Sequence, residues 1–263
     1  MNRDDLIYSD EHNPDIHKTL EKCGIVVIRD FLKIESFQNL EQETNTFIAQ
    51  YVNNKNIQPD LTMNFNKLRK STKTIINKRI AKRDGDEGLL DIWNINKNIN
   101  DNANKSLDSV KEYCLSLCNL AFELKYKFFT TNMYYNKSVS TTRGIHSDSG
   151  SFPSRVKSFL YMTDIKSVHD GPFSYILGSY RGNQNGEYPY HRKYKIYKPH
   201  PPDVNEYVIF DDLCKNDLII ACIAGAHRGI PQKKDHTRIA YVQSYDPTAV
   251  QSYDPTAKQL AML

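Results

Sequence analysis

Hydrophobic positions follow two different spacings along the chain, with the change near its middle. In the first half, Asn13 and Pro14 mark the start of a short helix over 14–23, and apolar positions on one helical face predict helices over 34–51 and 107–124. Between the first two helices, the β-branched run 24–30 has the composition of a buried strand. Gly24 is typical of the residue that ends a helix.

The second half consists of short strand-like runs with Gly, Pro, Asn and Asp between them. These runs cover residues 126–135, 156–163, 172–177, 207–210, 218–223 and 238–245. Because helices come first and strands follow, the order predicts an α+β protein with a mainly β core rather than alternating βαβ units. Regular short strands with turn signals are typical of a barrel or a two-sheet jelly roll.

Composition and charge describe an ordinary globular protein. The 263 residues are 39% hydrophobic and 25% charged, with a net charge of +4, which excludes collagen, a disordered protein and a disulfide-dense miniprotein. No apolar run is long enough to span a membrane, and the polar N-terminus does not resemble a signal peptide. The five cysteines are scattered, so we expect reduced thiols in a cytoplasmic protein. Core packing is expected for Cys114 and Cys118, because no second pair completes a zinc site.

We expect one domain over residues 1–249, with its β core over about 125–246. The octapeptide VQSYDPTA occurs twice in succession, at 242–249 and 250–257. One extra copy is too short to build a repeat fold. The first copy is expected to complete the last strand, and residues 250–263 are expected to form a disordered tail.

Two polar stretches interrupt the pattern. Lysine and arginine hold eight of the seventeen positions of the basic segment 67–83. Such a run can bind phosphate groups, but the aromatic residues of a single-strand binding groove are missing. The preferred interpretation is a solvated loop or helix face. Residues 94–104 include six asparagines, a composition typical of a loop.

A histidine and an aspartate stand two positions apart in the segment RGIHSDSG, residues 143–150. Side chains at this spacing project to the same side of an extended chain, so His146 and Asp148 can ligate one metal ion. A second histidine, His227, follows the buried strand 218–223 and three small residues. Two imidazoles and one carboxylate form the facial triad of non-haem Fe(II) oxygenases, which leaves coordination positions open.

Eleven residues beyond His227, Arg238 falls on the next expected strand. A buried arginine on a strand needs a carboxylate partner. The far carboxylate of a keto acid bound to iron suits the planar guanidinium group. His236 is the other candidate for the distal metal ligand. It lies two residues before Arg238 on the same face, which is too close for separate ligand and cosubstrate roles.

The order of these motifs resembles the phytanoyl-CoA dioxygenase family of iron- and 2-oxoglutarate-dependent oxygenases. The segments that carry the resemblance are 20–32, 159–165, 170–173 and 178–181. The family's central block usually contains T-D, then N-G-P and P-G-S-H. This chain departs from it at Asp170, Leu177 and Tyr180. The resemblance covers roughly residues 13–246.

The resemblance implies a double-stranded β-helix, a cupin-like jelly roll, with the N-terminal helices packed on one sheet. It also implies that His146, Asp148 and His227 bind Fe(II), and that Arg238 binds the far carboxylate of 2-oxoglutarate.

Other residues near the cosubstrate are less closely defined by the resemblance. Family members often have a serine two residues after the arginine, where this chain has Ala240. The hydroxyl groups of Tyr135 and Thr163 are candidates to replace it. Phe159 and Tyr161 share one face of their expected strand and are candidates to line the pocket, although both can be plain core residues.

The stretch 179–206 is rich in Tyr, Lys, Pro and Asn, and we expect it to form a lid over the substrate. Arg181 and Arg192 are its candidate substrate contacts.

The resemblance implies an O2-dependent enzyme that hydroxylates, desaturates or cyclises an unactivated C–H position, with succinate and CO2 as co-products. A polar or anionic small molecule is the expected substrate, and a monomer or homodimer the expected assembly, with no membrane partner and no nucleic acid. Two alternatives remain: a non-catalytic β-helix binding protein, and an oxygenase that acts on nucleic acid through the basic segment 67–83.

Overall fold

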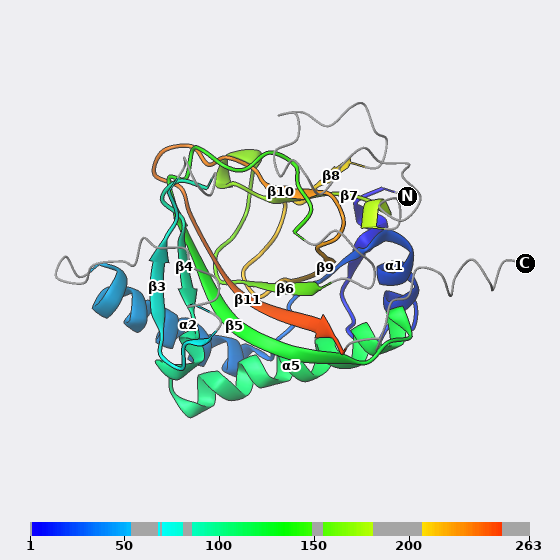
Figure 1. Ribbon diagram of the computed structural model, residues 1–263, viewed down its shortest axis with the longest axis horizontal. Helices are drawn as coiled ribbons and strands as arrows, with labels where there is room; N and C mark the ends of the chain where they lie inside the picture. Colours follow the sequence, from blue (N-terminus) through cyan, green and yellow to red (C-terminus); the bar gives the residue numbers. More distant parts are fainter. Residues whose placement is uncertain are drawn as a thin grey trace, which may run out of the picture.

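The computed structural model describes residues 2–53, 68, 70–80, 86–148, 155–180 and 207–248. In this part of the chain two β-sheets face each other, and helices cover the outer face of the larger sheet (Figure 1). The larger sheet has the strand order β1-β2-β9-β6-β11-β5-β4-β3, and the smaller sheet has the order β10-β7-β8. The predicted α+β class with a mainly β jelly roll is therefore confirmed.

The helices are α1 (Ile16–Cys23), α2 (Ile34–Phe47) and α5 (Asp101–Phe122), with short helical turns at Asp4–Leu6, Ile48–Val52, Ile95–Lys97 and Val168–Asp170. The strands are β1 (Ile7–Tyr8), β2 (Ile25–Ile28), β3 (Ile75–Lys78), β4 (Leu90–Trp93), β5 (Tyr126–Lys137), β6 (Val156–Tyr161), β7 (Phe173–Ile176), β8 (Tyr207–Ile209), β9 (Leu218–Cys222), β10 (His227–Gly229) and β11 (Thr237–Pro247). Within the described residues, none of the helices combines the length and the hydrophobicity that a membrane crossing requires.

Each predicted helix is present, with shifted ends. Helix α1 stops where Gly24 adopts a φ of 80°, a left-handed conformation that glycine takes without steric cost. Helix α5 begins earlier than the apolar pattern indicates, because the Asn100 side chain accepts a hydrogen bond from the Ala103 backbone N–H at 2.9 Å and caps the helix. Residues 101–104 of the asparagine-rich stretch are therefore helical, and the loop prediction is wrong there.

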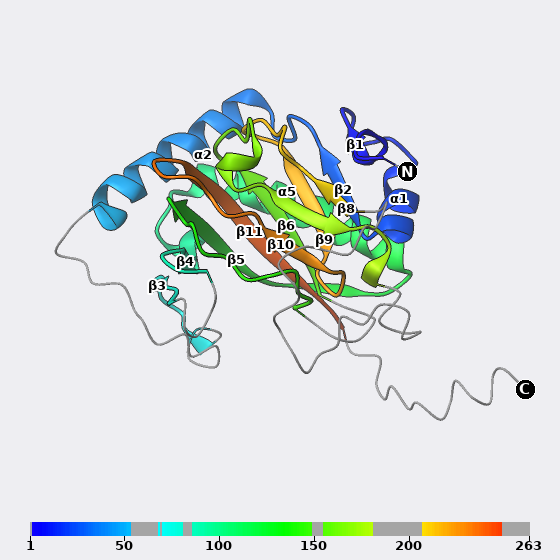
Figure 2. The ribbon, with the colours of Figure 1, turned by 90° about the horizontal axis from the view of Figure 1, so that it is seen from above.

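The predicted strands correspond to β2, β5, β6, β7, β8, β9 and β11. The hydrophobic pattern misses β1, β3, β4 and β10, short strands with polar or charged residues within or beside them. Strand β3 lies inside the basic segment and pairs with β4, so the prediction of a loop or helix face is wrong for residues 75–78. Strand β11 lies beside β5 along its whole length, through Pro247 (Figure 2). The second VQSYDPTA copy lies outside the described residues.

The larger sheet separates two hydrophobic cores. On β6, Leu160 belongs to the core beneath the helices, whereas Phe159 and Tyr161 belong to the inner core between the sheets. Cys114 and Cys118 are fully buried in the helix-side core, as predicted. The inner face of the larger sheet is therefore the one that can present side chains to a ligand between the sheets.

Candidate metal centre

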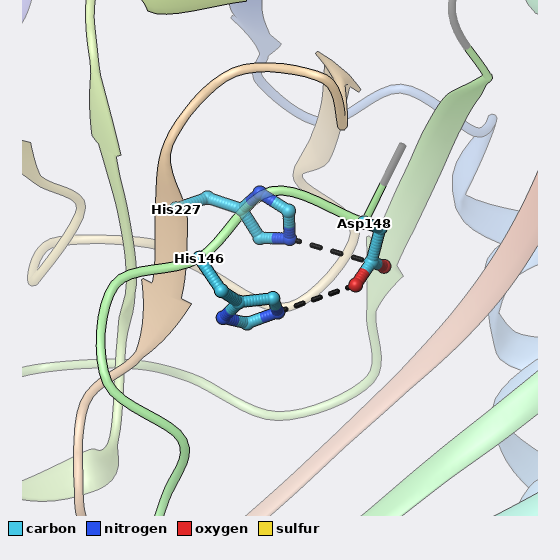
Figure 3. A group of neighbouring side chains, drawn as sticks. All are labelled: His146, Asp148 and His227. Atoms are coloured by element: carbon cyan, nitrogen blue, oxygen red, sulfur yellow. Dashed lines mark ion pairs between the residues drawn. The ribbon is translucent and has the colours of Figure 1, made fainter. Parts of the chain in front are cut away.

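The side chains of His146, Asp148 and His227 converge, with their ligand atoms all within 4.8 Å of one another (Figure 3). Nε2 of His146 lies 3.3 Å from Oδ1 of Asp148, and Nε2 of His227 lies 4.0 Å from Oδ2. The two imidazole ring centroids are 4.6 Å apart. One metal ion could contact all three side chains.

Main-chain hydrogen bonds hold these residues together. His227, the first residue of β10, forms an isolated antiparallel bridge with His146, in which each backbone N–H donates to the other's carbonyl at 2.9 Å. The Asp148 N–H donates to the carbonyl of Ile223, just after β9, at 2.9 Å. Backbone pairing therefore brings together segments that lie far apart in the sequence.

Each imidazole is oriented through its Nδ1 atom. Nδ1 of His146 lies 2.9 Å from the carbonyl oxygen of Gly144, and Nδ1 of His227 lies 2.8 Å from that of Gly225. A carbonyl only accepts, so each Nδ1 carries a hydrogen, and each Nε2 is the ring nitrogen that faces Asp148. Nε2 of His146 is buried and, apart from its 3.3 Å approach to Asp148 Oδ1, has no hydrogen-bond partner in the described part of the chain. A metal ion could be ligated by this nitrogen and the carboxylate together, so the three residues fit a metal site.

Burial and charge set the protonation states of this group. Burial, and next the neighbouring His146, lower the pKa of His227 to about 3. Burial by itself would raise the pKa of Asp148, but Lys157 and Arg143 outweigh it and hold that pKa well below its usual range. Near neutral pH, His227 is neutral and Asp148 is ionised, as metal binding requires.

Two basic side chains that sequence reasoning missed contact the carboxylate. Nη1 of Arg143 donates to Oδ1 of Asp148 at 3.2 Å, and Nζ of Lys157 donates to Oδ2 at 2.8 Å. Lys157, Phe159 and Tyr161 are two positions apart on β6 and therefore share one face of the strand. This alternation was the signal in the sequence that could have revealed the inward position of Lys157.

The ion pairs continue away from Asp148 into a buried network. Arg143 Nε and Arg79 Nη1 both contact Asp86 Oδ2, at 3.1 and 2.9 Å, and Arg79 Nη2 lies 3.3 Å from Asp91 Oδ2. The Arg79 side chain is only 7% exposed. The expectation that the basic segment is solvated is therefore wrong for Arg79, because carboxylates that follow it in the sequence neutralise it inside the fold. The described lysines of the segment, Lys70, Lys73 and Lys78, are exposed as expected.

Arg238 lies on β11, half-buried, and its Nη1 donates to the Gly171 carbonyl. A Cβ added at Gly229 would lie 3.3 Å from Arg238 Nη2, so the guanidinium packs against the backbone two residues beyond His227. Among the described residues, no carboxylate forms an ion pair with Arg238. Its planar donor edge could therefore bind a carboxylate ligand near the metal centre.

The two hydroxyl candidates lie in different places. Thr163 Oγ1 accepts a hydrogen bond from the Ile239 N–H at 3.0 Å, one residue from Arg238. Tyr135 pairs with Ile239 across β5 and β11, and both side chains belong to the helix-side core. Since neighbouring residues alternate between faces, the structure does not bring Tyr135 to Arg238. Tyr134, one residue earlier, packs against the inner core instead.

Phe159 and Tyr161 lie in the inner core, as the sequence suggested. The ring of Phe159 contacts that of Phe173 at a centroid distance of 5.1 Å, and Phe173 in turn stacks on His227 at 5.6 Å. Burial raises the pKa of Tyr161, and the nearby charge of Arg238 offsets part of this effect. The inner face of β6 therefore extends from the neighbourhood of Arg238 to the metal centre.

His236, the rival distal ligand, is bonded through Nδ1 to the carboxylate of Asp170 and is not part of the converging group. The structure thus agrees with the choice of His227. Arg181, Arg192 and the remainder of 181–206, where we expect a lid, lie outside the described residues.

No protein-family model matches the chain, and no curated protein matches it in sequence. Solved structures resemble it over most of its length. EvdO2 from Micromonospora carbonacea var. aurantiaca gives a TM-score of 0.59 at 14% identity, covering 92% of this chain and 95% of its own. SnoK, a non-heme alpha ketoglutarate dependent carbocyclase from nogalamycin biosynthesis, gives 0.58 at 12% identity, covering 97% and 93%. HygX from Streptomyces hygroscopicus, with nickel and 2-oxoglutarate bound, gives 0.54 at 11% identity, covering 88% and 85%.

These likenesses establish the architecture. The chain has the jelly-roll fold of the non-heme alpha ketoglutarate dependent enzymes, with its helices packed on one sheet as predicted. At such low identity the comparison shows the fold alone, so activity is argued from the side chains of this chain.

Proposed function

We propose that the protein is an Fe(II)- and 2-oxoglutarate-dependent oxygenase that acts on a small molecule. The observation that carries the proposal is the convergence of His146, Asp148 and His227, with the buried Nε2 of His146 lying 3.3 Å from the carboxylate. Two imidazoles and one carboxylate suit Fe(II) and leave positions open for a cosubstrate. The protein shares its fold with HygX, which was solved with nickel and 2-oxoglutarate.

In this proposal Arg238 binds the far carboxylate of 2-oxoglutarate. Its guanidinium lies against Gly229, which belongs to β10, the same strand as His227. Arg238 has no carboxylate partner among the described residues. A bidentate arginine–carboxylate contact would neutralise it. Thr163, whose hydroxyl contacts the neighbouring backbone, supports the position of Arg238.

When bound, Fe(II) and 2-oxoglutarate supply O2-dependent oxidation of an unactivated C–H bond, with succinate and CO2 as co-products. The residues of the chain orient the reactants and exclude water. Gly144 and Gly225 hold the imidazoles through Nδ1. Phe159 and Phe173 place an apolar wall beside His227.

We further propose that the product is formed by hydroxylation, desaturation or cyclisation of a polar metabolite, and that residues 1–249 form one oxygenase domain. Strands β1 and β11, from opposite ends of this range, belong to the same eight-stranded sheet, which supports a single unit. The proteins of similar structure include an epimerase, SnoN, and a carbocyclase, SnoK. Outcomes other than hydroxylation are therefore found on this fold.

The decisive experiment is an anaerobic titration of the metal-free protein with Fe(II) and 2-oxoglutarate, followed by admission of O2 and measurement of succinate. We expect a visible charge-transfer band and slow succinate release. Arg238→Gln should weaken 2-oxoglutarate binding by about 30-fold or more, because a charged hydrogen-bonded contact is lost, while Fe(II) affinity stays close to that of the wild type. Arg3→Gln, which removes a surface partner of Asp211, is the matched control. Absence of both the band and succinate would overturn the proposal.

A further inference from the structure

The inner face of β6 has a basic residue at the opposite end from Arg238. Strand pairing places Tyr161 opposite Ala240 and Lys157 opposite Ser244 on β11. Arg238 lies two residues beyond Ala240, so about six residues of strand, roughly 20 Å of backbone, separate it from Lys157. The two cations therefore occupy opposite ends of the inner face, and a short dicarboxylate bound at Arg238 leaves Lys157 available.

The charges around the metal centre do not balance once metal and cosubstrate are present. In the described part of the chain, one ion-pair network joins Arg79, Arg143 and Lys157 to the carboxylates Asp86, Asp91 and Asp148, and Arg238 adds a cation at the other end of the inner face. A divalent metal and dianionic 2-oxoglutarate cancel each other. Among these described side chains one positive charge then remains unmatched, which is unfavourable in a largely buried site unless an anion accompanies it.

Lys157 is the cation that loses its partner. Arg143 contacts Asp86 as well as Asp148, and Arg79 contacts both Asp86 and Asp91. Lys157 contacts only the Asp148 carboxylate among the described acidic residues, at 2.8 Å, and its side chain is 15% exposed. A metal ion bound to Asp148 would draw charge from the oxygens that hold Lys157.

We propose that Lys157, assisted by Arg143, binds an acidic group, a carboxylate or a phosphate, on the primary substrate. The inference rests on the proposed oxygenase function and names its substrate class: a small molecule with one anionic group, held on the side of the metal away from Arg238. The ammonium group is compact and can turn from Asp148 toward such a group without moving β6.

The test uses the full-length enzyme and pairs of compounds that differ only in charge: amino acids and their amides, and sugar phosphates and the parent sugars. With Fe(II) and 2-oxoglutarate, we expect only acidic members to accelerate succinate release, and either the carboxylates or the phosphates to be preferred. In a second step Ni(II) replaces Fe(II), because Ni(II) does not support turnover. Calorimetry then measures the affinity of the accelerating compound for the protein loaded with Ni(II) and 2-oxoglutarate.

Lys157→Gln removes the charge but keeps a hydrogen-bond donor on the side chain at this position. We expect this variant to bind the acidic compound at least about tenfold more weakly, with a smaller change in Ni(II) and 2-oxoglutarate affinity. Lys157→Arg should restore part of the binding. Lys18→Gln, at an exposed position on α1, is the matched control.

Three outcomes overturn the inference. In the first, neutral members accelerate succinate release as much as acidic ones, and in the second, no acidic member accelerates it or binds. In the third, Lys157→Gln loses as much affinity for Ni(II) as for the acidic compound. The last would mean that Lys157 only positions Asp148. Succinate release from the wild type without an acidic preference defeats this inference alone, whereas absence of Fe(II)- and 2-oxoglutarate-dependent succinate defeats the proposed function.

Discussion

His146 and His227 exchange both of their main-chain hydrogen bonds, each N–H donating to the other's carbonyl at 2.9 Å. This bridge sets the ring centroids 4.6 Å apart, while Gly144 and Gly225 orient the rings. The positions of the two imidazoles therefore follow from backbone pairing, which keeps them close before any metal binds.

The first prediction concerns this pair. His146→Ala removes one nitrogen donor but leaves the backbone bridge intact, so Ni(II) affinity should fall by at least about 100-fold, while the melting temperature of the metal-free protein changes little. Calorimetric titration measures the affinity. His12→Ala, at an exposed position, should bind Ni(II) like the wild type. Equal Ni(II) affinity in the His146→Ala variant would remove this residue from the site.

A second prediction is the pH dependence of stability in the metal-free protein. Burial lowers the pKa of His227 to about 3, whereas the ordinary value is 6.5. Between these values the unfolded chain binds a proton that the folded protein does not. The free energy of unfolding should therefore fall as the pH drops below about 6.5, by up to about 1.4 kcal/mol per pH unit. Asp148, whose pKa is held well below 3.8, contributes a further loss only at lower pH.

Urea unfolding at several pH values between about 7 and 5 measures this slope. His227→Gln should make the slope shallower, because glutamine takes up no proton in either state. A slope that is the same in both proteins would show that His227 is not held neutral by the fold.

The third prediction concerns the buried network. Arg79→Gln leaves Asp86 and Asp91 without their shared cation, and the three side chains are 7%, 12% and 1% exposed. Removing one member of a buried ion pair costs about 3–5 kcal/mol. Denaturant unfolding should show a loss of this order. Lys18→Gln breaks the exposed pair with Asp15 and should cost about 0.5 kcal/mol or less. Similar losses in the two variants would mean that the network adds no stability.

The fourth prediction concerns Gly225, which lies two residues before His227. A Cβ at Gly225 would overlap the ring and hydroxyl of Tyr175, which is fully buried and donates to the Cys222 carbonyl at 2.8 Å. Gly225→Ala should destabilise the protein by about 1–3 kcal/mol. It should also weaken Ni(II) binding by about tenfold, because the Gly225 carbonyl orients His227.

Gly88→Ala is the comparison for this variant. Its φ of +87° makes alanine strained, but no atom lies within 4 Å of the added Cβ. It should reduce stability by about 1 kcal/mol and leave Ni(II) affinity unchanged. If Gly225→Ala behaved in the same way, contact with Tyr175 would not matter for the metal centre.

The amino-acid sequence by itself determined the long elements and the candidate ligands. These signals are local, so α5 could be predicted from its apolar spacing, α1 from its flanking residues Asn13, Pro14 and Gly24, and β9 from its continuous apolar run. The pair His146 and Asp148 was also visible locally, because residues two apart share a face of an extended chain.

Only the tertiary structure decided which residues surround these ligands. The place of Tyr134 rather than Tyr135 beside the inner core depends on strand register, where a shift of one residue exchanges the two faces. The pairing of Arg79 with Asp86 and Asp91 depends on β3 and β4, which the hydrophobic pattern did not reveal. Lys157 and Asp148 meet because two separate segments approach each other. Local sequence patterns do not predict such contacts, because burial and pairing arise only when separate segments pack together.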